Sequence, residues 1–306
     1  MLAVWAGAFA ALLCVVLAAA SAAAARPVVV ASKIDTEGAL LGNMILELLA
    51  AHGVPAENRI QLGPTDIVRR ALIAGQIDIY PEYTGNGAIF FHMPTDPAWR
   101  NGAAGYRLVA ALDEKQNGLI WLAAAPADNT WVIALRRGLA ERNHIATLAD
   151  LARYLKAGGH FKLAASAEFV ESPAALPAFE KTYGFALSDR QLLTLSGGNT
   201  AATLRAAAEK MSGVNAAMAY GTDGALSALR LVALRDDKGA QTVYRPAPVV
   251  RGAVLKEFPQ LPKLLDPVFA TLTRRVLQRL NARIAVAGER AEAVAAAYLK
   301  KRRFLP

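Results

Sequence analysis

The sequence VVVASKIDTEGALLGNMILELLAAHG, at residues 28–53, predicts a strand, a turn and a helix in direct succession. Its first four residues, 28–31, form a short apolar run typical of a buried strand. After a turn at residues 32–36, apolar residues recur at helical spacing until Gly53 and Pro55 end the helix. This order of elements begins a βαβ unit, which implies a mainly parallel sheet covered by helices.

The same plan continues along the chain up to residue 122. A second helix is expected at residues 65–74, ending at Gly75, and a second strand at residues 77–80. A third helix at residues 99–113 and a third strand at residues 119–122 follow. These elements make up most of one α/β lobe.

A second lobe is predicted to begin after residues 125–129, where the pattern changes and a strand starts at Trp131. Thr147 and Asp150 form a capping box at the start of a helix. The elements expected in this lobe are strands at 131–135, 161–165 and 214–219, and helices at 148–156, 173–183, 200–210 and after Thr222.

The polar run at residues 236–239 is the best candidate for the return crossing, because residues 244–250 then predict a strand that leads into the final helices. The expected fold class is therefore α/β with two lobes. The first lobe is discontinuous, with residues 26–130 and 240–306, and the second comprises residues 131–239. Two crossings make a hinge, and the cleft between two lobes is a usual place for a ligand.

Residues 1–25 have the composition of a cleaved export signal. They carry no charged side chain, and an apolar run at 12–17 leads into small residues at 18–25 that supply A-x-A cleavage sites. A membrane anchor is the alternative, because an uncharged segment of this length could span a bilayer. Cys14 is the one cysteine of the chain, so the cleaved protein would contain no thiol. We expect a periplasmic protein.

The net charge argues against a nucleic-acid partner. The chain has 34 basic and 25 acidic residues, a formal charge of +9. The one basic cluster, at residues 300–303, is expected to be a solvated helix end. Nucleic-acid binding needs a basic stripe with interleaved aromatic residues, and the sequence contains none.

The sequence carries no motif of a catalytic or phosphate-binding kind, such as G-x-S-x-G, a Walker loop or G-x-G-x-x-G. Its four histidines do not pair at the spacing of metal ligands. The carboxylates that could serve as acid or base stand in turns and at helix starts, where capping is the usual role; they are Glu37, Glu82, Glu168 and Asp223. The sequence therefore predicts no enzyme, metal or cofactor.

Aromatic residues stand out in polar loops at the ends of predicted strands. They are Tyr83, Trp131, Tyr220 and Tyr244, and they come from both lobes. In an α/β sheet, ligands bind in the crevice outside the carboxyl ends of the strands. Packing at the lobe edge would explain any one of these residues, but four together favour an aromatic cage. Ring faces attract a cation that cannot donate hydrogen bonds.

Five motifs resemble those of the glycine betaine, choline and proline betaine binding proteins of ABC importers. They are SKIDTEG at 32–38, DIYPEYTG at 78–85, NTW at 129–131, AYGTDG at 219–224 and APVVR at 247–251. The resemblance covers nearly the whole mature chain. It implies a type II periplasmic-binding fold that closes on its ligand, and a partnership with an ABC permease in the inner membrane and its cytoplasmic ATPase.

The resemblance also implies individual ligand contacts. Lys33 and Asn86 would contact a ligand carboxylate, Asn129 would add backbone polarity near the cation, and Trp131 takes a place that is usually tyrosine. Ser172 stands where relatives carry an arginine that pairs with the betaine carboxylate. Losing such a charge-assisted hydrogen bond weakens binding by roughly ten- to a hundredfold, so weak betaine binding is expected. The predicted ligand-binding residues are Lys33, Tyr83, Asn86, Asn129, Trp131, Tyr220 and Tyr244.

Taken with the resemblance, the sequence predicts a monomeric periplasmic binding protein that captures a quaternary ammonium osmoprotectant for an ABC importer. The alternative is a sensory or regulatory periplasmic domain that uses the same fold for another small solute. Genes for a permease and an ATPase beside the coding sequence would separate the two.

Overall fold

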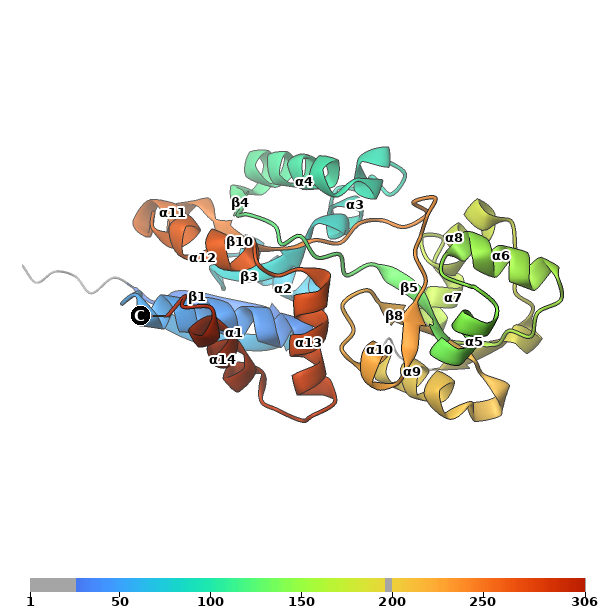
Figure 1. The fold of residues 1–306 in the computed structure, drawn as a ribbon. Helices are drawn as coiled ribbons and strands as arrows, with labels where there is room; N and C mark the ends of the chain where they lie inside the picture. Colours follow the sequence, from blue (N-terminus) through green and yellow to red (C-terminus); the bar gives the residue numbers. More distant parts are fainter. Residues whose placement is uncertain (1–25, 196–199, 306) are drawn as a thin grey trace, which may run out of the picture.

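The computed structural model describes residues 26–195 and 200–305, which fold into two lobes (Figure 1). The predicted signal peptide and Cys14 fall in residues 1–25 and lie outside the described residues, as does the membrane-anchor alternative. In the described part of the chain, no helix is both long and apolar enough to cross a membrane.

The first lobe is built on a five-stranded sheet with the strand order β2-β1-β3-β10-β4. Its strands are β1 (Val28–Lys33), β2 (Ala56–Gly63), β3 (Ile79–Tyr83), β4 (Leu119–Trp121) and β10 (Pro246–Arg251). Its helices are α1 (Thr36–Ala51), α2 (Thr65–Ile73), α3 (Gly87–Phe90), α4 (Gly102–Asn117), α11 (Gly252–Glu257), α12 (Leu261–Phe269), α13 (Arg274–Ala285) and α14 (Ala291–Lys301). The last four helices follow β10, so the chain ends in the lobe where it began (Figure 1).

The second lobe repeats this plan with a five-stranded sheet of order β7-β6-β8-β5-β9. Its strands are β5 (Trp131–Arg136), β6 (Leu163–Ser166), β7 (Leu192–Leu195), β8 (Ala216–Tyr220) and β9 (Leu231–Ala233). Its helices are α5 (Arg137–Arg142), α6 (Leu148–Lys156), α7 (Ala167–Glu171), α8 (Leu176–Tyr183), α9 (Thr200–Glu209) and α10 (Ala225–Ala228).

Each sheet contains one strand that runs against the other four. Strand β10 is antiparallel to β3 and β4, and β5 is antiparallel to β8 and β9. The other neighbours pair in parallel. The predicted α/β fold with mainly parallel sheets is therefore confirmed. The two reversed strands are the first strands after the two crossings, so each one starts at the hinge and runs away from it.

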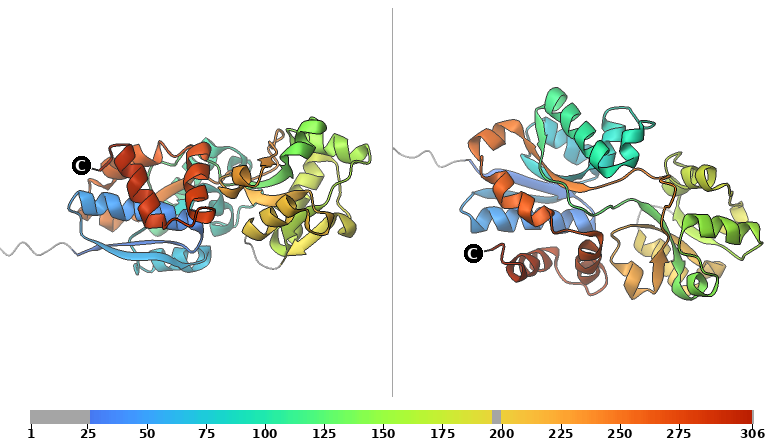
Figure 2. Two further views of the ribbon diagram at one scale, coloured as in Figure 1. Left: turned by 60° about the horizontal axis from the view of Figure 1, so that its bottom comes forward. Right: turned by 45° about the horizontal axis from the view of Figure 1, so that its top comes forward.

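The two crossing segments are hydrogen-bonded to each other. The backbone N–H of Asn129 donates to the carbonyl of Tyr244 at 2.9 Å, and the hydroxyl of Thr130 donates to the carbonyl of Thr242 at 2.7 Å. The N–H of Tyr244 in turn donates to Asp128 Oδ1 at 2.9 Å. Figure 2 shows the two segments running between the lobes. They form a two-stranded connection, the arrangement that a hinge between lobes requires.

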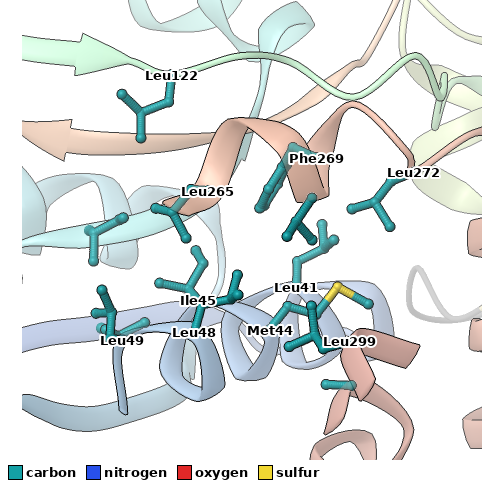
Figure 3. Close-up of a cluster of buried hydrophobic side chains, with 14 of the residues drawn as sticks. Leu41, Met44, Ile45, Leu48, Leu49, Leu122, Leu265, Phe269, Leu272 and Leu299 are labelled. Atoms are coloured by element: carbon teal, nitrogen blue, oxygen red, sulfur yellow. The ribbon is translucent and has the colours of Figure 1, made fainter. Parts of the chain in front are cut away.

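Helix α1 is the centre of the core of the first lobe. Figure 3 shows its apolar side chains packed against α12 and α14, with Leu265, Phe269 and Leu299 on the facing helices. Full burial of such side chains contributes about 1.5–3 kcal/mol each. The α1 residues that are at most 1% exposed are Leu40, Leu41, Met44, Ile45, Leu48 and Leu49, all predicted from their helical spacing. This packing fixes the N-terminal end of α1, where the polar residues of the site begin.

Several local predictions are confirmed. The capping box at the start of α6 is present, since the Asp150 N–H donates to Thr147 Oγ1 at 3.1 Å and the Thr147 N–H donates to Asp150 Oδ2 at 2.9 Å. Helix α2 and strand β5 lie where the sequence predicts them, within one residue at each end.

Other elements differ from the prediction. Strand β2 was not expected, because half of its sequence AENRIQLG is polar; it is an exposed edge strand that pairs with β1. Elements α5, β7 and β9 were also missed. The helix predicted at residues 99–113 starts at residue 102, because Asn101 caps α4 by accepting hydrogen bonds from the N–H groups of Ala103 and Ala104.

Candidate functional site

Three of the four predicted cage residues lie at or beside paired strand ends next to the hinge, and the fourth lies in the hinge itself. Trp131, the first residue of β5, is in register with Tyr220, the last residue of β8. In the first lobe, Tyr83 is the last residue of β3 and is in register with Pro246, the first residue of β10. Tyr244 lies two residues before that strand, in the second crossing. Each sheet therefore has an aromatic residue at a strand end next to the hinge.

Trp131 and Tyr220 form a stacked pair in the second lobe. Their ring centroids lie 4.5 Å apart with 30° between the ring planes. Phe169 of α7 is completely buried and also contacts Trp131, with ring centroids 5.4 Å apart and 60° between the ring planes. Phe169 was missed by the sequence analysis, although it follows Glu168 in a segment already singled out there. This contact helps to hold the Trp131 indole in position.

Tyr244 lies against the turn that follows β3. A Cβ atom on Gly85 would come within 2.8 Å of the Tyr244 ring and 2.6 Å of Thr242 Cγ2, so a side chain at residue 85 would displace both. The tight turn predicted around Asn86 is a 3₁₀ turn, Thr84–Asn86. Gly85 thus lets the second crossing approach the end of β3 closely.

Tyr83 is buried, and its contacts are polar. Its hydroxyl donates to Glu37 Oε1 at 2.9 Å, and Lys33 Nζ lies 4.7 Å from the centroid of its ring. Among the residues that the structure describes, neither Tyr83 nor Tyr244 stacks on another aromatic ring. The structure therefore joins Trp131 and Tyr220 as a pair and leaves the two tyrosines of the first lobe separate from them.

Lys33 and Asn86 meet at one carboxylate, that of Glu82. Lys33 Nζ lies 2.5 Å from Glu82 Oε1 in a buried ion pair, and Asn86 Nδ2 donates to the same oxygen at 2.7 Å. The other oxygen, Oε2, accepts from the hydroxyl of Tyr80 at 2.7 Å. The backbone N–H of Tyr83 also donates to Oε1, at 2.6 Å. Glu82, one of the four carboxylates considered above, is an ion-pair partner in this structure.

Glu37 binds three side chains from distant parts of the sequence. Its Oε1 accepts from Asn129 Nδ2 at 2.9 Å as well as from Tyr83, and its Oε2 accepts from Asn281 Nδ2 at 2.7 Å. The cap of α1 is supplied by Asp35, whose Oδ1 accepts from the Gly38 N–H at 2.7 Å. Glu37 is only 4% exposed, and its side chain points to the site because Asp35 supplies the helix cap. The sequence analysis did not identify Asn281.

Asn281 connects Glu37 to the second lobe. Its Nδ2 also donates to the carbonyl of Thr222 at 3.0 Å, and Gln278, one turn earlier on α13, donates to the carbonyl of Gly221 at 2.9 Å. The 221–224 loop follows β8 directly, next to Tyr220. Helix α13 therefore touches the second lobe beside the stacked aromatic pair, where Figure 1 shows it facing α10.

The electrostatic surroundings of the tyrosines are acidic. Burial, followed by the charges of Glu168, Asp128 and Glu82, raises the pKa of Tyr244 to about 12. Burial and then the charge of Glu37 raise the pKa of Tyr83 well above its ordinary value. All three tyrosines, Tyr220 included, therefore stay neutral at physiological pH, with intact ring faces.

Asp223 and Glu37 are among the carboxyl groups at the site whose pKa values are raised. Burial raises the pKa of Asp223 to about 6, although the Tyr220 N–H at 2.8 Å and the Thr200 hydroxyl at 3.2 Å favour its charged form. Burial also raises the pKa of Glu37, against the side-chain hydrogen bonds from Asn129, Thr222, Asn281 and Tyr83. Aromatic faces and buried carboxylates both attract positive charge, so the arrangement suits an organic cation.

No metal centre is evident in the described ranges, where no three His, Cys, Asp or Glu side chains group to hold an ion. A cavity of about 620 Å³ lies apart from the aromatic residues, near the end of β5 opposite Trp131. Its charged lining is basic and includes Arg136, Arg137, Arg142, Lys210 and Arg230. The aromatic residues and this basic cavity are therefore separate.

Comparison with known proteins gives one consistent result. The family described as the substrate binding domain of ABC-type glycine betaine transport system (OpuAC) matches residues 26–301. The chain is 58% identical over 302 residues to the glycine betaine-binding protein YehZ of Escherichia coli (strain K12), covering 99% of this chain and 98% of that protein. A glycine-betaine-binding protein of Pseudomonas aeruginosa is 32% identical over 282 residues, with coverages of 90% and 88%.

The comparison of structures agrees. The solved structure of apo YehZ from Escherichia coli matches with a TM-score of 0.82 and 60% identity, covering 92% of this chain and 100% of that one. The resemblance found in the sequence motifs is therefore confirmed, and with it the two-lobed type II periplasmic-binding fold.

Proposed function

This chain belongs to the family of substrate-binding domains of ABC-type glycine betaine transport systems, and we propose that it captures a quaternary ammonium osmoprotectant such as glycine betaine between its lobes. Proteins of this family are receptors of importers and are not enzymes. The match does not favour the alternative of a sensory domain for an unrelated solute.

The observation that carries the proposal is the stacked pair of Trp131 and Tyr220 at the hinge end of the second sheet. Tyr83 and Tyr244 stand at the matching edge of the first sheet. A desolvated cation–π contact contributes up to about 2 kcal/mol, so four rings supply roughly 4–8 kcal/mol before the entropy of binding is subtracted. A micromolar site needs about 8 kcal/mol net. The polar residues of the proposed site are Lys33, Asn86 and Asn129.

Closure of the two lobes completes the cage in this account. The hinge is the pair of crossings tied together by Asn129, Thr130 and Tyr244. We place the lobe boundaries between residues 130 and 131 and between residues 239 and 240. Movement about these points would bring the Trp131 pair toward the tyrosines of the first lobe and exclude water from the ligand.

We also propose where this protein acts and with which partners. Residues 1–25 would direct export and be removed, and the mature protein would act in the periplasm as a monomer. The closed, ligand-bound form would dock on an ABC permease of the inner membrane, which is driven by a cytoplasmic ATPase. The family membership supports this assignment, since its members serve ABC importers.

Calorimetric titration of the mature protein with glycine betaine, choline and proline betaine tests the proposal, with proline as the matched ligand that lacks a quaternary ammonium. We expect saturable heat with at least one of the three quaternary ammonium compounds and none with proline. Heat with proline and none with the other three would overturn the proposed function.

A further inference from the structure

The two side chains expected to hold a ligand carboxylate are already engaged. Lys33 and Asn86 both donate to Glu82 Oε1, at 2.5 and 2.7 Å. The charge of Lys33 is cancelled by an acid that is completely buried. Residue 172, where the resemblance places an arginine, is Ser172. A ligand carboxylate entering here would meet no uncompensated cation among these three residues.

Glu37 presents the opposite situation, a buried carboxylate that lacks a counter-charge. Its partners are neutral donors, namely Tyr83, Asn129, Asn281 and Thr222, and it forms no ion pair with any residue in the described ranges. A buried charge costs several kcal/mol unless an opposite charge compensates it. Because Glu37 is hydrogen-bonded to a cage tyrosine, a cation held by that ring would lie beside it.

Further acids surround the cage. Asp35 caps α1, Asp223 accepts from the N–H of Tyr220, and Glu168 acts on the pKa values of both Tyr220 and Tyr244. Within residues 26–195 and 200–305, none of these three acids forms an ion pair. Lys33 lies over the Tyr83 ring, but its charge is paired with Glu82. Arg274 is half exposed and lies 4.0 Å from Asp128, and Arg245 also acts on that carboxylate. The fixed charge around the aromatic residues is therefore negative.

We propose that this site prefers ligands that carry a net positive charge over zwitterions, and that Glu37 is the counter-charge of the bound quaternary ammonium. The inference rests on the proposed function and specifies its ligand class. A zwitterion gains the same contacts for its head group, but its carboxylate is placed among unpaired acids. A ligand with the same head group and a neutral tail avoids that repulsion.

The test compares two ligands of nearly equal shape, glycine betaine and its amide, carbamoylmethyl-trimethylammonium, which keeps the head group and lacks the carboxylate charge. Calorimetry at pH 7 should give a Kd for the amide at least about tenfold below that for glycine betaine. Choline should also bind more tightly than glycine betaine. Equal affinities, or tighter binding of glycine betaine, would overturn the inference. Because both ligands are measured on the unaltered protein, this comparison does not depend on the folding of any variant.

Glu37→Gln tests the assigned residue. It keeps the shape of the side chain and removes the charge, so the preference for the amide should fall at least about threefold, mainly through weaker amide binding. Glu47→Gln, in the same helix and away from the site, should leave the preference unchanged, and thermal unfolding checks that both variants fold. An unchanged preference in folded Glu37→Gln would overturn the role of Glu37. If neither the amide, choline nor glycine betaine binds, the proposed function itself fails, which is a different result from loss of preference.

Discussion

The Nζ atom of Lys33 lies 2.5 Å from Oε1 of Glu82, and both side chains are buried at the hinge end of the first sheet. Lys33 was predicted to contact a ligand carboxylate, but in the structure it pairs with an internal acid. The hydroxyl of Tyr80 and the N–H of Tyr83 complete the hydrogen bonds of Glu82. The position of Tyr83, and with it one wall of the site, therefore depends on an internal ion pair.

Removing one member of this pair should destabilise the fold strongly. Lys33→Met leaves Glu82 buried without its cation, which costs about 3–5 kcal/mol for a pair of this kind. The double variant Lys33→Met/Glu82→Gln has no uncompensated charge and should recover a large part of that loss. Urea unfolding of the wild type, the two single variants and the double variant measures this coupling. Additive losses would show that the two residues do not stabilise each other.

Tyr220→Ala should weaken ligand binding about thirtyfold, because it removes one cation–π contact of about 2 kcal/mol from the stacked pair. Tyr220→Phe keeps the ring and should bind within a few-fold of the wild type. Tyr154→Ala, which removes a tyrosine of the second lobe away from the cage, is the matched control. Calorimetry with the tightest quaternary ammonium ligand checks the series. Unchanged affinity in Tyr220→Ala would show that Tyr220 is not part of a ligand-binding cage.

Gly85→Ala should also weaken binding, by at least about tenfold if the new methyl group displaces one ring of the cage. The reason is steric, since the added Cβ would lie 2.8 Å from the ring of Tyr244. In a Tyr244→Ala background the same change should cost less, because the ring is already absent and only the clash with Thr242 remains. A double-mutant cycle of Kd values measures this. Full additivity would mean that Gly85 acts through something other than Tyr244.

Asp223 should make stability depend on pH. Its pKa is raised by burial to about 6 from an ordinary 3.8, so the native state holds the proton more tightly than the unfolded chain. Its charge therefore disfavours the fold above pH 6, by about 3 kcal/mol, and this cost disappears as the pH falls toward about 4. Asp223→Asn keeps an acceptor for the Tyr220 N–H and removes the titration.

Urea unfolding of both proteins between pH 4 and pH 7 provides the measurement. The variant should gain stability relative to the wild type as the pH rises from about 4 to about 6, with little further gain above pH 6, and the difference between the two proteins cancels the other titrating groups. A difference that is the same at pH 4.5 and pH 7 would contradict the raised pKa.

The sequence predicted what local pattern controls and missed what depends on tertiary contacts. Helix α1 follows from apolar spacing, and the α6 capping box follows from Thr147 and Asp150, three residues apart. Strand β2 has only two large apolar side chains, Ile60 and Leu62, and as an exposed edge strand it is held by backbone pairing with β1.

In the candidate site, too, some residues could be predicted from local sequence and others depend on tertiary contacts. Its aromatic residues were predictable because each stands at a strand end in a polar loop. The bond between Glu37 and Asn281 was not, since the two residues are 244 positions apart and meet only when α13 packs beside α1. Likewise, no local signal indicates that Lys33 is neutralised by an acid 49 residues away.

A crystal structure of the mature protein with choline bound is the most direct measurement of the central claim. The account predicts the ligand nitrogen within about 6 Å of the ring centroids of Trp131 and Tyr220 from one lobe and of Tyr83 or Tyr244 from the other. A ligand bound elsewhere, such as in the basic cavity near Arg136, with the four aromatic residues unoccupied, would contradict it.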